Sequence, residues 1–224
     1  GDETEQNIIT IAWTGIVNTD PPMTYISVRK ERHSHGIIAR TGEFVINLTT
    51  KDLAFATDYC GVRSGRKVDK FKEMDLTPAK SRKVSCPSIG ESPVNLECKV
   101  LDVREFPTHD MFLAEIIGVS VEESLMDEKG RLRLEDAGLI AYSHGSYVAL
   151  QHKELGTFGY SVMKPKTRRR IAAQKRQDNH ARKAKQGDRE GKNGKRPEAP
   201  VRGQASRRNS SGRKKSHSPA KKIR

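Results

Sequence analysis

The amino-acid sequence predicts a β-rich α+β domain built around a barrel, with a few short helices and a disordered basic tail. Apolar runs of strand length recur between turn residues up to about residue 150, and only brief helix-like patterns interrupt them. After Met163 the composition changes to Lys, Arg, Gly, Ser, Asn and Pro, without Phe, Tyr or Trp. We therefore expect a folded domain over residues 1–160 and a separate tail over residues 164–224.

The first part of the domain is expected to contain three strands and three short helices. Ser34 is the expected N-cap of the first helix and Gly42 its end, because hydroxyl side chains favour helix starts and glycine favours helix ends. Gly61 is expected to stop the second helix. Residues 18–22, with two prolines, form a turn. The spacing of apolar residues predicts strands over residues 7–14, 23–29 and 43–47, and helices over residues 33–40, 51–59 and 68–74.

The second part of the domain is expected to be mainly strands. Residues 93–103 alternate apolar and polar side chains, which indicates a strand with one wet face and Cys98 on the buried one. Residues 111–121 form another strand, in which Gly118 marks a bend. The short runs 139–142 and 147–150 close the domain.

Charge divides the chain at the same boundary as composition. Residues 1–163 carry a net charge of −5 and residues 164–224 carry +19, which together give the +14 of the whole chain. A segment this polar buries too little surface to offset its ordering entropy, so we expect disorder, with partial helix over residues 167–185. Three interpretations stay open for the tail: a solubilising extension, non-specific binding of nucleic acid or another polyanion, and frame-shifted sequence. Because the tail lacks aromatic residues for base stacking, we do not expect sequence-specific recognition.

Cysteine usage and hydropathy point to a reduced, cytoplasmic location. The three cysteines Cys60, Cys86 and Cys98 have no CxxC spacing, as expected for free thiols. Apolar runs are too short for a membrane span, and no secretion signal is evident.

Four motifs in a fixed order carry a resemblance to a known family. They are Asn7–Gly15 with the only Trp, Ser27–Ser34, Gly42–Asn47 and Cys60–Phe71. Over about residues 5–152 the chain resembles the flavin reductase-like, FMN-binding split-barrel family, in its flavoredoxin-type branch. Relatives usually carry an apolar strand before the turn at residues 1–5, so the first strand of the barrel is expected to be missing, which leaves an exposed edge.

The resemblance implies that the strand over residues 7–14 passes beside the flavin ring. A flat ring needs a wall that excludes water and offers backbone N–H groups, and small side chains allow that approach. For Trp13 alone, a place in the core is the competing interpretation. The expected ring-wall residues are Asn7, Thr10, Ala12, Trp13 and Thr14.

The same resemblance places the flavin phosphate at Arg29, Arg32 and Ser34. Arginine offers a planar fork of donors, and a serine near a helix start adds a hydroxyl and the helix dipole. The competing interpretation is a solvated charged turn. In the second signature, Ser64 and Lys70 are expected to bind the cofactor, and Lys70 can reach a phosphate or a flavin oxygen.

Gly65, in that second signature, is expected to adopt a turn conformation closed to other residues. The competing interpretation of the signature is a basic loop that ends on a core Phe71. By resemblance, His109 approaches the flavin edge, Asn47 shapes the pocket, and an aromatic residue of the closing segment around Tyr147 borders the cofactor.

The chain shows no metal-ligand spacing, nucleophile motif, P-loop or GxGxxG, so a nicotinamide would use a shallow site over the flavin. These features predict an FMN-dependent oxidoreductase that works with NAD(P)H or with an electron-donor protein, as a homodimer; catalytic residues other than His109 are not assigned. The alternative is a non-catalytic split barrel that binds polyanions through its tail. The presence of Trp13, Arg29, Arg32, Ser64 and Lys70 favours the enzyme.

Overall fold

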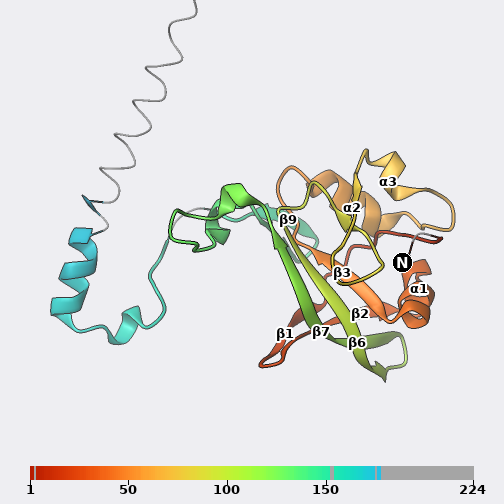
Figure 1. Ribbon diagram of the computed structural model, residues 1–224, viewed down its shortest axis with the longest axis horizontal. Helices are drawn as coiled ribbons and strands as arrows, with labels where there is room; N and C mark the ends of the chain where they lie inside the picture. Colours follow the sequence, from red (N-terminus) through yellow and green to blue (C-terminus); the bar gives the residue numbers. More distant parts are fainter. Residues whose placement is uncertain (3, 152–153, 175, 178–224) are drawn as a thin grey trace, which may run out of the picture. The chain divides into compact units, whose positions relative to one another are not determined.

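The computed structural model describes residues 1–2, 4–151, 154–174 and 176–177. The chain divides into two units, Gly1–Glu154 and Leu155–Arg224. The first unit contains strands β1–β9 and helices α1–α3, several of which are labelled in Figure 1.

A five-stranded antiparallel sheet forms the centre of the first unit. Its strand order is β1-β2-β7-β6-β3. The long strands β6 and β7 run side by side, and their hairpin extends away from α2 and α3, as does the β1–β2 hairpin (Figure 1). The strands are β1 (Thr14–Thr19), β2 (Pro22–Arg29), β3 (Glu43–Asn47), β6 (Val94–Glu105) and β7 (His109–Val121).

Two small hairpins accompany this sheet, one from β4 (Pro78–Ala79) and β5 (Ser88–Ile89), the other from β8 (Ile140–Ser143) and β9 (Ser146–Ala149). The β8–β9 hairpin is tethered by hydrogen bonds from its flank to residues 49–51. The closing segment of the domain is thereby held beside the start of α2.

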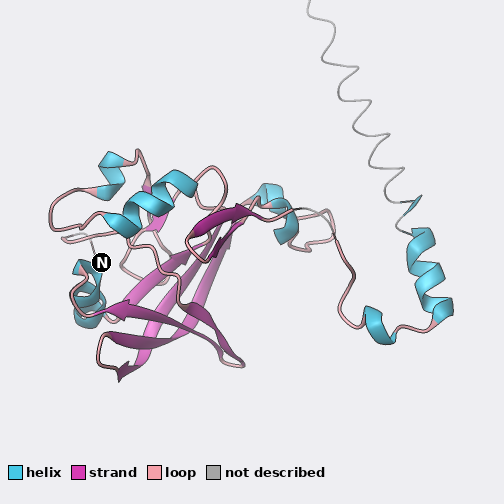
Figure 2. Cartoon of the chain, turned by 180° about the vertical axis from the view of Figure 1, so that it is seen from behind, coloured by secondary structure: helices cyan, strands magenta, loops and turns pink. Residues whose placement is uncertain are grey.

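Three short α-helices lie beside the sheet, and α2 and α3 are neighbours (Figure 2). Gly42 ends α1 in the left-handed region at φ 67°, where glycine has no Cβ penalty. The helices are α1 (His33–Thr41), α2 (Ala54–Val62) and α3 (Lys70–Glu73), with 3₁₀ turns η1 (Glu123–Leu125), η2 (Leu134–Asp136) and η3 (Tyr160–Val162).

The core consists of two clusters, with residues 7–12 between them. The larger cluster packs α1 against the sheet through side chains such as Phe44 and Phe112, and Ile9 and Ile11 pack against it. The smaller cluster lies around α3, and Ile8 packs against that one. Alternate side chains of this extended segment are therefore taken up by two different cores.

Most of the expected elements are confirmed. β2, β3, β6, β7, β8, β9 and the three helices lie where the pattern placed them, to within a few residues. Cys98 is fully buried, and all three cysteines are free and buried. The β6–β7 register shifts between Glu97 and Cys98, opposite Gly118, which agrees with the expected bend.

Three local predictions are wrong. Of the strand expected over residues 7–14, only Thr14 belongs to β1, because the preceding residues lie between two cores and have no ladder partner. Arg32, not Ser34, occupies the N-cap of α1, and Ser34 lies buried within the helix. Helix α2 continues through Gly61 to Val62. A Cβ at Gly61 would meet Thr10 at 3.2 Å, so this glycine provides close packing instead of a helix stop.

The second unit is described for residues 155–174 and 176–177. It contains η3 and helical residues 165–174. The helix expected over residues 167–185 is confirmed for residues 167–174 and 176–177. The rest of the expected tail lies outside the described residues. In the part of the chain that the structure describes, no helix is long and apolar enough to cross a membrane.

Candidate functional site

Two adjoining hollows in the first unit bring together most of the predicted site residues. The neutral cavity has a volume of about 600 Å³ and is lined mainly by apolar and hydroxyl side chains. The basic hollow has a volume of about 490 Å³ and is lined largely by cationic side chains. Asn7, Ile9 and Ser34 line both, so the two hollows meet along residues 7–9 and the start of α1.

Residues 7–12 form one wall of the neutral cavity, facing side chains of β3 and α2. Tyr142 and Tyr147 line it from the β8–β9 hairpin, with ring centroids 5.2 Å apart. The Tyr147 hydroxyl donates to the Asp58 carboxylate at 3.2 Å. Burial and this carboxylate together raise the pKa of Tyr147. The cavity therefore combines an apolar wall with two aromatic rings and a carboxylate.

Cationic side chains dominate the basic hollow. Arg29 and Arg63 are exposed there, and Arg29 pairs with the exposed Glu31, at 3.4 Å. Arg63 lies over the Tyr59 ring at 5.9 Å. An exposed ion pair of this kind is weak, so both guanidinium groups can turn toward an anion.

The other two strong cations of the basic hollow are bound to backbone carbonyls. Arg32 donates to the carbonyl oxygen of Gly61 at 2.9 Å. The Lys70 ammonium donates to the carbonyls of Ile8, at 2.6 Å, and Cys60, at 2.7 Å. Lys70 is only 4% exposed, and burial lowers its pKa.

Asn7 connects the two hollows and depends on the absence of a side chain at Gly65. The Asn7 amide donates to the Ser34 hydroxyl at 2.8 Å. A Cβ at Gly65 would overlap that amide. Gly65 is not one of the glycines with a positive φ, so the expected turn conformation is wrong. Glycine is needed here because the Asn7 side chain lies too close for a Cβ.

A buried carboxylate holds a loop that contributes lining residues to the neutral cavity. Glu97 is 1% exposed and accepts hydrogen bonds from the backbone N–H groups of Arg82, at 3.1 Å, and Lys83, at 2.6 Å. The loop it holds continues to Cys86 and Pro87, which line the cavity. Glu97 is thus an internal anchor for this loop.

A second polar network joins α1 to the start of β7. His35 Nε2 lies 2.7 Å from an Asp110 carboxylate oxygen, and Lys30 Nζ lies 3.2 Å from the other. Burial raises the pKa of Asp110, but the hydrogen bonds from His35 and Lys30 outweigh it and bring the pKa below its ordinary value.

The structure places the predicted site residues in three groups. Asn47 is held by its own contacts, because its amide oxygen accepts from the Ile89 N–H at 2.8 Å. The neutral cavity is lined by Asn7, Thr10, Ala12, Thr14, Ser34 and Asn47. The basic hollow is lined by Asn7, Arg29, Arg32, Ser34, Ser64 and Lys70.

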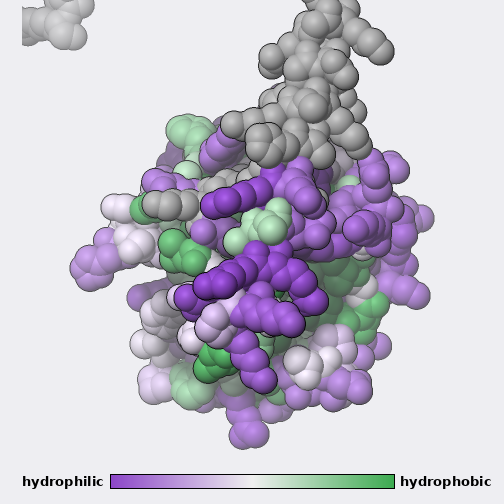
Figure 3. Space-filling view, turned by 90° about the vertical axis from the view of Figure 1, so that its left-hand side faces the viewer, coloured by the Kyte–Doolittle hydropathy of each residue, from purple (hydrophilic) through white to green (hydrophobic). Residues whose placement is uncertain are grey.

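Trp13 and His109 line neither hollow. Their rings stack on each other with centroids 4.5 Å apart. Trp13 is 59% exposed, so the competing interpretation of a core tryptophan is wrong. Exposed apolar side chains continue along β1 and the β6–β7 end of the sheet, and on the face drawn in Figure 3 hydrophobic side chains interrupt a mainly hydrophilic surface.

Sequence reasoning missed Arg63, Asp58 and Tyr142 as lining residues. Arg63 lies inside the Cys60–Phe71 signature, directly before Ser64, and its charge was a usable signal. Asp58 lies on α2 and Tyr142 on β8, and neither stands in a pattern that distinguishes it from a surface residue.

Comparison with known proteins agrees with this architecture. Residues 1–151 match the family described as Flavin reductase like domain, and the chain belongs to this flavin reductase-like family. An uncharacterised Pyrococcus abyssi protein is 29% identical over 153 residues, which covers 68% of this chain and 87% of that protein. An uncharacterised Archaeoglobus fulgidus protein is 32% identical over 123 residues, covering 55% of this chain and 70% of that one.

Solved structures show the same fold. The flavoredoxin of Desulfovibrio vulgaris (Miyazaki F) matches with a TM-score of 0.66 and 29% identity, over 71% of this chain and 87% of that one. A flavoredoxin from Methanosarcina acetivorans matches with a TM-score of 0.64 and 31% identity, over 70% and 85%. The expected split-barrel fold is thereby confirmed, and family membership supports a flavin cofactor and a flavin-related oxidoreductase role.

Proposed function

We propose that this protein is an FMN-dependent oxidoreductase of the flavin reductase or flavoredoxin type. Its bound FMN would take electrons from NAD(P)H or from an electron-donor protein. The single observation that carries the proposal is the neutral cavity joined to a basic hollow through Asn7, Ile9 and Ser34. FMN has the same division, with a flat, largely apolar ring at one end and a phosphate at the other.

The residues present fit such a cofactor. Arg29 and Arg63 would bind the phosphate, since guanidinium groups match phosphate oxygens and neither is committed to a buried partner. The Ser64 hydroxyl lies in the same hollow. The volume of the neutral cavity is in the ordinary range for a ligand site, about 300–1,000 Å³.

Bound flavin supplies the electron-transfer chemistry, and the protein binds, orients and shields it. Residues 7–12 would form the wall on which the ring lies, and their apolar side chains would keep water from one of its faces. Tyr142 and Tyr147 would border the ring from the β8–β9 hairpin. Among the described residues, no group of three His, Cys, Asp or Glu side chains could hold a metal ion, so no metal enters the proposal.

Homodimer formation is part of the proposal. Exposed apolar side chains at β1 and at the β6–β7 end of the sheet support it, because an apolar surface of this kind favours a protein interface. They are Trp13, Ile16, Val17, Leu101, Val103 and Phe106. Light scattering on Val17→Glu, which puts a charge on this surface, is expected to show a monomer where the unmodified chain is a dimer.

Polyanion binding by residues 164–224 is a further part of the proposal. Its described beginning is exposed and basic, with Lys164, Lys166 and Arg168–Arg170. Such binding would rest on counterion release and so would weaken steeply with salt.

The experiment that tests the function compares FMN with riboflavin, which lacks the phosphate. Flavin-free protein is titrated with each, and FMN is expected to bind more tightly by about 2–4 kcal/mol, since charged hydrogen bonds contribute about 1.5–3 kcal/mol each. The double variant Arg29→Gln/Arg63→Gln is expected to lose most of that difference.

Arg104→Gln is the matched control, because Arg104 pairs with Asp102 on β6 and lines neither hollow. Equal affinity of the unmodified protein for both flavins would contradict the phosphate assignment. Anaerobic stopped-flow mixing of the FMN complex with NADH, and separately with NADPH, then identifies the nicotinamide donor. If neither nicotinamide reduces the bound FMN, an electron-donor protein is the remaining source of electrons in the proposal.

A further inference from the structure

Lys70 is a buried ammonium group whose hydrogen bonds go to the backbone. It is the first residue of α3 and only 4% exposed. Its Nζ donates to the carbonyls of Ile8 and Cys60, which are far from each other in sequence. A buried charge is costly unless it is paired or hydrogen-bonded, so these two contacts are needed for it to be charged here.

Both carbonyls need a partner from outside their own segment. Cys60 lies in the last turn of α2, where carbonyl groups have no partner within the helix. Ile8 belongs to the extended segment 7–12, which pairs with no strand among the residues that the structure describes. Lys70 therefore supplies, with one side chain, the hydrogen-bond donor for a carbonyl at the end of α2 and for a carbonyl in the wall of the neutral cavity.

The neighbouring contacts join the same pieces. The Thr10 hydroxyl donates to the Thr57 carbonyl of α2. Arg32 donates to Gly61 and so ties the start of α1 to the end of α2. Asn7 donates to Ser34. Residues 7–10, the start of α1 and the end of α2 thus form one hydrogen-bonded unit, and Lys70 is its most buried cation.

We propose that Lys70 is a positioning residue for the flavin site, which fixes residues 7–12 against α2, and is not a ligand of the phosphate. This differs from the direct contact expected from the sequence, and it rests on the proposed function. A phosphate ligand would contribute to FMN binding alone. A positioning residue shapes the wall that both FMN and riboflavin would contact, so its loss weakens both.

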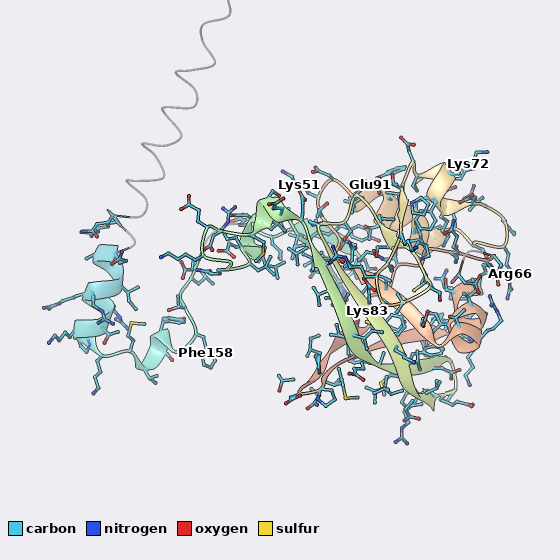
Figure 4. All side chains as sticks on the ribbon, in the orientation of Figure 1. Lys51, Arg66, Lys72, Lys83, Glu91 and Phe158 are labelled. Atoms are coloured by element: carbon cyan, nitrogen blue, oxygen red, sulfur yellow. The ribbon has the colours of Figure 1, made fainter. Side chains whose placement is uncertain are left out.

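The test is Lys70→Met, which keeps most of the length and the unbranched shape of the side chain and removes its donors. Lys72→Met is the matched control, because Lys72 is two residues away and its side chain is exposed (Figure 4). Affinities for FMN and riboflavin are measured at low temperature, with circular dichroism to establish that each variant is folded. We expect Lys70→Met to weaken the binding of both FMN and riboflavin by about ten- to a hundredfold, which corresponds to the loss of one charged hydrogen bond, with the ratio of the two affinities changed by less than about threefold.

Two outcomes would overturn the proposal. Loss of FMN affinity with riboflavin unaffected would make Lys70 a phosphate ligand. Unchanged affinity for both flavins in a folded but less stable variant would make it a residue of stability only.

Lys70→Gln keeps the question decidable if the Met variant does not fold. Its neutral amide retains two N–H donors for the Ile8 and Cys60 carbonyls, so the affinities for FMN and riboflavin are expected to fall by a similar factor relative to the unmodified protein. A selective loss of FMN in this variant would again indicate a phosphate ligand.

Hydrogen exchange without flavin separates failure of this inference from failure of the proposed function. In the ligand-free protein, the amides of Ile9–Ala12 are expected to exchange faster in Lys70→Met or Lys70→Gln than in Lys72→Met. If the unmodified protein binds neither flavin, the proposed function fails while this result still decides whether Lys70 holds the segment. Equal exchange rates would refute the positioning role.

Discussion

Replacement of Gly65 by alanine tests whether the two hollows depend on a single close approach. The added Cβ would overlap the Asn7 side-chain amide, and Asn7 would have to move away from Ser34. Because Asn7 lines both hollows, a methyl group outside the neutral cavity is expected to disturb both halves of the site.

The expected cost follows from two contributions. Overpacking of a well-packed site costs about 1–3 kcal/mol. Loss of the Asn7–Ser34 hydrogen bond adds about 0.5–1.5 kcal/mol, since Ser34 is buried. We therefore expect Gly65→Ala to lower the free energy of unfolding by about 1.5–4.5 kcal/mol.

The assay is urea unfolding followed by circular dichroism, with FMN affinity measured in parallel. Gly36→Ala is the control, because nothing lies within 4 Å of a Cβ built there and Gly36 is exposed in α1. That variant is expected to gain up to about 1 kcal/mol from helix propensity.

A double-mutant cycle with Asn7→Ala isolates the contact. Removal of the amide removes the overlap, so Asn7→Ala/Gly65→Ala should cost about 1–3 kcal/mol less than the sum of the two single variants. Additive costs would refute the reasoning, as would a Gly65→Ala variant as stable as the unmodified protein.

Three further predictions concern other parts of the chain. Glu97→Gln should destabilise the protein by about 1–3 kcal/mol in urea unfolding, because a neutral amide oxygen accepts hydrogen bonds more weakly than the buried carboxylate and the amide NH2 group cannot accept at all; Glu91→Gln, at an exposed carboxylate bound to Thr77 N–H (Figure 4), should cost far less. Asp110 has a lowered pKa in the folded state, so its contribution to stability is present above the ordinary carboxyl pKa and is lost as pH falls below about 4. When the free energy of unfolding is measured against pH, Asp110→Asn should therefore show a smaller loss of stability below about pH 4 than the unmodified protein, and an equal loss would contradict the prediction. A chain ending at residue 163 should keep its flavin and lose its retention on heparin, and loss of flavin instead would place the tail in the site.

The sequence predicted most of the fold because local periodicity and glycine positions specify it. Alternation over residues 93–103 identified β6, and Gly42 ended α1 in the backbone conformation that glycine favours. The same alternation misled over residues 7–14. It reports that alternate side chains face different environments, and two separate cores produce this pattern as readily as one sheet.

The candidate site was predicted less completely because it depends on contacts between distant segments. The motifs point to Ser64 and Lys70, but the role proposed for Lys70 depends on its contact with Ile8, which is 62 positions away. Gly61 and Gly65 were interpreted from local chemistry, whereas Thr10 and Asn7 are the neighbours that explain them. No window of sequence contains both partners of such a contact.

The division among the cations bears on how the site would bind an anion. A count of charge near the basic hollow treats Arg29, Arg32, Arg63 and Lys70 as equivalent, yet two of them donate to backbone carbonyls and two are exposed. Cations held by carbonyls have no conformational entropy left to lose and keep the hollow electropositive before a ligand arrives. Exposed arginines must be ordered on binding, at about 0.5–1.5 kcal/mol for each long side chain. Affinity for the phosphate should therefore depend on the exposed pair, while the shape of the site that both flavins contact should depend on the pair held by backbone carbonyls.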